Sequence, residues 1–262
     1  MQTLKNILIF ALAILALTPA MGHGTQTNAA RRVQRVVELT NIERMKAGLA
    51  PLKFNAQLGD AAQWMAQDMA QNNYFAHTDK LGRGIVQRIP AHGYAKARNL
   101  GENLAAGQAS VADAMKAWLT SEGHRANLLS PNYREIGASY LASDKGSYET
   151  YWVQEFGSRA NVYPLIINGE AAQTESAEVK LYVHGKEWAQ GMRFSNDGKN
   201  WTEWETFTSE KSWNLEKGEG TRTVYVEIRN TDGEILTAED TIMLSTSALA
   251  DRNTTKTAVA RK

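Results

Sequence analysis

The hydrophobic pattern of this 262-residue chain changes near residue 160, and that change limits the fold more than any other feature. Before it, apolar residues such as Val33 and Val37 recur at the spacing of amphipathic helices. After it, Val179, Leu181 and Val183 alternate with polar residues, as in half-buried strands. The fold class predicted from this change is α+β, with a mixed helix-and-sheet domain followed by an all-β sandwich.

Within the first domain, helices are expected near residues 33–45 and 55–70, and a third is expected to begin after Ser110, a good N-cap residue. Alternation from residue 136 to 155, interrupted around 143–146, predicts two antiparallel strands. The long polar and glycine-rich stretch between the second and third helices is interpreted as a functional loop, because such loops are uncommon in compact domains.

The charge distribution supports the same division. Residues 31–162 carry 16 basic and 12 acidic side chains, whereas residues 163–245 carry 8 basic and 15 acidic ones. Turn pairs such as Asn168-Gly169 and Asp232-Gly233 separate about seven short strand signals in the second segment, which is typical of a β-sandwich.

The N-terminus has the order of a secretory signal: Lys5, an apolar run over residues 7–17, and then the small residues Ala20 and Gly22. The run is shorter than the roughly 20 residues that span a bilayer, so cleavage is favoured over an uncleaved anchor. A secreted or periplasmic protein is expected, without a stable membrane span after cleavage. The predicted segments are a signal peptide at 1–22, the first domain at 31–160, the β-sandwich at 163–245 and a flexible tail at 246–262.

The amino-acid composition excludes or disfavours several classes of protein function. The chain has no cysteine, which excludes disulfides, thiolate catalysis and cysteine zinc sites. Its formal net charge is +1, which argues against nucleic acid as a partner.

The candidate site comes from four short segments of the first domain, centred on His77, Glu102, His124 and Glu135. Two imidazoles and two carboxylates in one cleft could ligate a divalent metal, act as general acid and base, or hydrogen-bond one another and fix the long loop. The spacing of 47 positions between the histidines is a weak metal signal, and no nucleophile motif is present. His23, His92 and His184 are interpreted as structural or surface residues.

The order of these segments resembles the CAP superfamily, also called SCP-like domains, in a cysteine-free bacterial form. The resemblance covers roughly residues 31–160. The segments that carry it are Thr40-Asn41-Ile42-Glu43-Arg44, Phe75-Ala76-His77-Thr78-Asp79, Gly101-Glu102-Asn103-Leu104-Ala105, Trp118-Leu119-Thr120-Ser121-Glu122-Gly123-His124-Arg125, Glu135-Ile136-Gly137 and Tyr151-Trp152-Val153-Gln154-Glu155-Phe156-Gly157.

The resemblance implies an α-β-α sandwich with a central cleft lined by two histidines and two acidic residues. His77, Glu102 and His124 match the motif positions. Glu135 is our choice for the fourth residue, and Glu122 is its rival. Metal binding in some members of the family makes His77 and His124 the candidate ligands of a divalent ion, zinc or calcium. The second domain is similar to bacterial Ig-like or fibronectin-type modules, a likeness at the level of fold alone.

We therefore expect a secreted, non-enzymatic binding module that uses the His/Glu cleft. Its partner would be an extracytoplasmic protein, a lipid or a cell-wall ligand. Two alternatives stay open: a metal-dependent, peptidase-like hydrolase that uses the same cleft, and a surface adhesion protein that acts through the β-sandwich.

Overall fold

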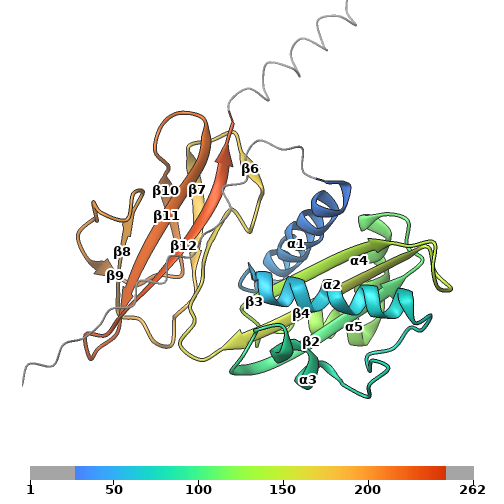
Figure 1. Ribbon diagram of the computed structural model, residues 1–262. Coiled ribbons are helices and arrows are strands. Elements are labelled where there is room, and N and C mark those ends of the chain that lie inside the picture. Colours follow the sequence, from blue (N-terminus) through green and yellow to red (C-terminus); the bar gives the residue numbers. More distant parts are fainter. Residues whose placement is uncertain (1–26, 246–262) are drawn as a thin grey trace, which may run out of the picture.

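The computed structural model describes residues 27–245. Figure 1 shows helices gathered around one sheet and, beside them, a region built from strands. We call residues 27–162 the N-terminal part and residues 163–245 the C-terminal part. The predicted signal peptide, His23 and the predicted tail lie outside the described residues. Across residues 27–245, no helix is both long and apolar enough to cross a membrane.

Most helices of the N-terminal part begin where the sequence places a capping residue. Thr27, Asn55 and Ser110 each accept a hydrogen bond from a backbone N–H three residues later, which satisfies one free donor of the first turn. The helices are α1 (Asn28–Lys46), α2 (Ala56–Gln71), α3 (Ile85–Ala91), α4 (Val111–Thr120) and α5 (Glu122–Leu128).

A single sheet lies between these helices. Its strands, in spatial order, are β1 (Lys53–Phe54), β3 (Glu135–Ala142), β4 (Thr150–Arg159) and β2 (Ala97–Ala106). β3 and β4 are antiparallel and joined by the predicted turn, and β2 pairs antiparallel with the other side of β4. β2 is therefore an edge strand.

The two faces of the sheet bury separate cores. On β4, Tyr151 and Val153 pack against α2, whereas Trp152 and Phe156 point the other way, toward α1 and α4. This alternation is the period-2 pattern of a strand buried on both faces. The result is an α+β arrangement with α2 on one face and α1, α4 and α5 on the other (Figure 1).

The stretch predicted as one long loop contains more regular structure than expected. The predicted loop, residues 75–107, holds all of α3 and all of β2. Periodicity missed the strand because its buried residues include Gly101, Glu102 and Asn103, which do not read as a hydrophobic face. The segment between α2 and α3 remains irregular.

In the C-terminal part, the described residues form two sheets that share one apolar core, with Phe194, Val224 and Leu181 among its members. Eight strands are present where the sequence predicted about seven. One sheet has the order β10 (Glu210–Asn214), β7 (Glu178–Val183), β5 (Leu165–Ile167). The other has the order β6 (Gln173–Thr174), β12 (Ile235–Leu244), β11 (Gly220–Arg229), β8 (Gly191–Ser195), β9 (Glu205–Thr206).

The C-terminal part contacts α1, β1 and the residues just before β1. Lys53 forms ion pairs with two acidic residues of the C-terminal part, Glu170 at 2.9 Å and Asp240. His184, which is 7% exposed, donates from Nε2 to the carbonyl oxygen of Pro51 at 2.9 Å. Since these contacts are buried and polar, they fix the position of one part against the other.

Substituting Gly137 tests the packing of α2 on the sheet. An added Cβ would lie 2.1 Å from the backbone carbonyl carbon of Leu58 and 2.2 Å from the nitrogen of Gly59. We expect Gly137→Ala to lower the free energy of unfolding by about 3 kcal/mol or more, measured by urea denaturation, because backbone atoms cannot move aside cheaply. Gly123→Ala is the control, since no heavy atom lies within 4 Å of its added Cβ. Equal stability of the two variants would contradict this packing.

His184 predicts an acid sensitivity of the junction. Burial lowers its pKa from 6.5 to about 4, so the unfolded chain binds a proton in the interval where the folded chain does not. The stabilisation is complete above pH 6.5 and declines toward pH 4, by up to about 3 kcal/mol. Urea denaturation across this interval should give a shallower pH dependence for His184→Gln than for the parent protein. Identical slopes would show that His184 titrates freely in the folded state.

Candidate functional site

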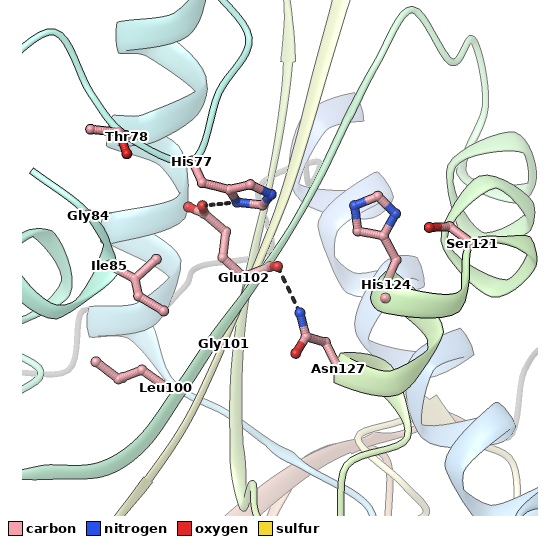
Figure 2. A pocket seen from close by; sticks show the side chains of 11 residues that line it. His77, Thr78, Gly84, Ile85, Leu100, Gly101, Glu102, Ser121, His124 and Asn127 are labelled. Carbon is pink, nitrogen blue, oxygen red and sulfur yellow. Dashed lines mark hydrogen bonds and ion pairs between the residues drawn. The ribbon is translucent and has the colours of Figure 1, made fainter. Parts of the chain in front are cut away.

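The candidate site is a cavity of about 560 Å³ along the edge strand β2. One wall comes from the segment between α2 and α3, which carries His77, and the opposite wall comes from α5, which carries His124. Figure 2 shows the two imidazoles on either side of β2, with Glu102 between them. Because β2 has no neighbouring strand on this side, both helical layers can bring side chains to the same edge.

Glu102 holds the His77 wall in place. Its Oε1 lies 2.6 Å from Nδ1 of His77, and its Oε2 is paired with the guanidinium of Arg88 on α3. Arg88 is fully buried and also donates to the carbonyl oxygen of His77 at 3.2 Å. Since a carboxylate accepts, Nδ1 of His77 carries a proton whether the ring is neutral or cationic, and Nε2 is the nitrogen left for the cavity.

A second buried carboxyl group lies behind this pair. Glu155 on β4 is fully buried, and its Oε1 is 3.3 Å from the same Nη2 of Arg88. Burial and the neighbouring charge of Glu102 raise the pKa of Glu155 well above its ordinary value. This direction favours the neutral acid, so Arg88 compensates the charge of Glu102 in particular.

A chain of amides positions the His124 wall. Asn127 on α5 donates to the carbonyl oxygen of Glu102 at 3.0 Å, and Asn103 on β2 donates to the carbonyl oxygen of His124 at 3.0 Å. Asn103 also donates to Gln154 on β4, which in turn donates to Thr40 on α1. These bonds tie α5 to the edge of the sheet and leave the His124 ring without a hydrogen-bond partner in the described residues.

The two imidazoles have opposite pKa shifts. The hydrogen bond to Glu102 raises the pKa of His77 despite partial burial. Burial, together with the positive charge of His77, lowers the pKa of His124. These directions favour a cationic His77, whose Nε2–H can donate into the cavity, and a neutral His124, which can accept.

Gly101 has a steric reason to precede Glu102. A Cβ at this position would lie 2.3 Å from the hydroxyl oxygen of Tyr133. The hydroxyl group of Tyr133 in turn donates to the carbonyl oxygen of Leu100 at 3.3 Å. Glycine thus lets β2 approach the aromatic ring that supports it.

The structure brings together three of the four predicted site residues. Glu135 does not line this cavity: it is buried at the start of β3, where Arg159, Tyr94 and Asn55 bind its carboxylate. Its rival Glu122 is the first residue of α5, is exposed, and does not line the cavity either. The site therefore consists of His77, Glu102 and His124.

The donor set does not fit a zinc site with three protein ligands. The carboxylate of Glu102 is already bound to His77 and Arg88. The atoms left to coordinate a metal are therefore one ring nitrogen of each histidine. Within residues 27–245, no group of three or more histidine and acidic side chains is placed to hold a metal ion. Catalytic zinc sites use three protein ligands and an open position, so we derive no metal-dependent step from this cavity.

Sequence reasoning missed Arg88, Asn127 and Glu155 as parts of the site. Glu155 lies within a recognised segment and Asn127 lies two residues after another, yet nothing in the spacing shows that their side chains turn toward Arg88 or the edge of β2. Arg88 gave no signal at all, since a single arginine in a short helix is usually solvated.

This arrangement of helices around a sheet, with the two histidines at its edge, defines a class of domain. Residues 37–156 match the family model described as CAP: cysteine-rich secretory protein family. This match agrees with the resemblance that the sequence motifs indicated for this part of the chain.

Similar proteins share this part of the chain. "Uncharacterized protein YkwD" of Bacillus subtilis is 39% identical over 123 residues, which are 47% of this chain and 46% of the relative. "Uncharacterized membrane protein YlbC" of the same organism is 32% identical over 126 residues, 48% of this chain and 34% of the relative. The chain thus spans less than half the length of these curated relatives.

Among solved structures, an extracellular protein containing a SCP domain from Bacillus anthracis is similar, with 30% identity and a TM-score of 0.45. The similarity covers 52% of this chain and 45% of that one.

Replacing Glu102 tests the link between the carboxylate and His77. We expect Glu102→Gln to lower the pKa of His77, because the hydrogen bond that His77 donates to Glu102 is the main cause that raises it. Histidine NMR titration measures this directly. Glu135→Gln removes the other candidate carboxylate, which is bound to Arg159, and should leave the pKa of His77 unchanged. A shift of equal size in both variants would contradict the three-residue site.

Proposed function

We propose that the protein is a binding module that holds a polar ligand between His77 and His124. The observation that carries this proposal is the pair of imidazoles on opposite walls of one cavity, with opposite pKa shifts. A ligand group that both accepts and donates, such as a hydroxyl or an amide, would complement a donating His77 and an accepting His124.

The other lining residues support a ligand of mixed character. Ile85 and Leu100 line the cavity beside Gly101, while Thr78 and Ser121 add hydroxyl groups (Figure 2). Two apolar side chains thus stand beside a mostly polar lining, and the volume of about 560 Å³ lies within the usual range of small-molecule sites.

A non-enzymatic role agrees with this chemistry better than the hydrolase alternative does. A metal-dependent hydrolase needs an ion held firmly enough to activate water, and His77 and His124 supply only two protein ligands. The adhesion alternative would place binding in the C-terminal part, away from both histidines. We further propose, from the apolar run at residues 7–17, that the protein is exported to act outside the cytoplasm.

Binding to two probes tests the proposal: purified peptidoglycan and phospholipid vesicles, each by co-sedimentation. We expect one of them to bind the protein, and His77→Ala/His124→Ala to weaken that binding roughly tenfold or more, because two hydrogen bonds are lost. His92→Ala is the matched control, since His92 follows α3 and does not line the cavity.

Each contrary result points to a different alternative. Undiminished binding by the double variant would contradict the cleft as the binding site and favour the C-terminal part. Release of soluble fragments from either probe would favour the hydrolase. Calorimetric titration with zinc and with calcium addresses the metal: stoichiometric binding that the double variant loses would restore the predicted metal site.

A further inference from the structure

A second cavity, of about 330 Å³, lies at the junction of the two parts. Arg98 contributes from β2, Arg159 from β4, and Arg134 from the residue before β3. The C-terminal part contributes Lys186, in the turn that follows β7. Four cationic side chains from segments far apart in the sequence thus converge on one concave site.

The opposing negative charge at this cavity is small. The acidic residue in its lining is Glu187, whose side chain is 77% exposed and lies 3.9 Å from Arg134. Arg159 is paired with Glu135 through Nε and Nη2. Within residues 27–245, Arg98 and Lys186 form no ion pair. Uncompensated like charges in one concave site repel one another, and an anion relieves that repulsion.

Two of the arginines are held in place before any ligand arrives. The guanidinium of Arg134 donates to the carbonyl oxygen of Val162 at 3.1 Å and lies 4.7 Å from the ring centre of Tyr163. Arg159 is fixed by its pair with Glu135 and lies 4.7 Å from the ring centre of Tyr94. Fixed guanidinium groups lose little entropy when they bind, and their planar fork fits carboxylate and phosphate oxygens.

Neutral polar groups complete the lining. Asn99 and Ser158 lie on paired strands and are joined by a 2.9 Å hydrogen bond from the amide to the hydroxyl oxygen. The Ser158 hydroxyl accepts this bond and keeps its own O–H, which can donate to an anion oxygen that the cations do not reach. Asn132 also lines the cavity.

We propose that this cavity binds a small multivalent oxyanion, through phosphate or carboxylate groups held by Arg98, Arg134 and Lys186. Its volume lies at the lower end of the range for small-molecule sites, which suits a compact anion. Residues on both sides of the junction would contact the ligand, so bound anion should stabilise the two parts against each other. This site is separate from the His77/His124 cavity and does not depend on its function.

Calorimetry with pyrophosphate and with citrate, at constant ionic strength, tests the proposal and distinguishes the two anion chemistries. We expect the parent protein to bind at least one of them. Arg98→Gln/Lys186→Gln should weaken that binding roughly tenfold or more, because charge-assisted hydrogen bonds are lost. Both residues are exposed, so their replacement should not disturb folding.

The matched control is Arg31→Gln/Lys145→Gln, which changes the net charge equally at exposed positions away from the cavity. It should bind the anion as the parent protein does. Failure to bind either anion at up to about 10 mM, or equal weakening in the control variant, would overturn the proposal. His77→Ala/His124→Ala should bind the anion normally, so failure of the first cavity cannot be mistaken for failure of the second.

Discussion

The candidate cleft depends on one buried cation. Arg88 is fully buried on α3, and its Nη2 contacts the carboxyl groups of Glu102 and Glu155 on two neighbouring strands. Removing a buried partner from such a set leaves charge without compensation, which is far more costly than losing an exposed ion pair. Arg88 therefore fixes α3 against the sheet. Glu102, which Arg88 holds in place, in turn positions the ring of His77 through their hydrogen bond.

The edge position of β2 explains why the site forms there. An inner strand has hydrogen-bonded neighbours on both sides, whereas the free side of β2 is open to both helical layers. Asn127 takes up one of the free carbonyl oxygens, that of Glu102, and brings α5 to the edge. His77 and His124 thus face each other because two different layers end at the same strand.

The sequence predicted the elements whose apolar periodicity is strong. The structure contains the predicted helix α2 and the predicted β3–β4 hairpin, and Ser110 caps α4 as expected. β2 was missed because its central residues are polar yet buried, and their burial is stabilised by side-chain hydrogen bonds that no periodicity reveals.

The side-chain contacts of the candidate site were likewise only partly predictable from the sequence. His77, Glu102 and His124 lie in recognisable segments and come together at β2. Glu135 lies in an equally recognisable segment, but its carboxylate is bound by Arg159, Tyr94 and Asn55 and does not line the cavity. Which cation a buried carboxylate meets follows from tertiary packing. Sequence spacing alone does not contain that information.

The central claim is that the carboxylate of Glu102 fixes the orientation of His77 and leaves Nε2 for a ligand. The most direct measurement is the nitrogen-15 chemical shift of both ring nitrogens of His77, recorded above the pKa of that imidazole. The account predicts a neutral ring with its proton on Nδ1, hydrogen-bonded to Glu102. A neutral ring with its proton on Nε2 would contradict it, because Nδ1 could then not donate to the carboxylate.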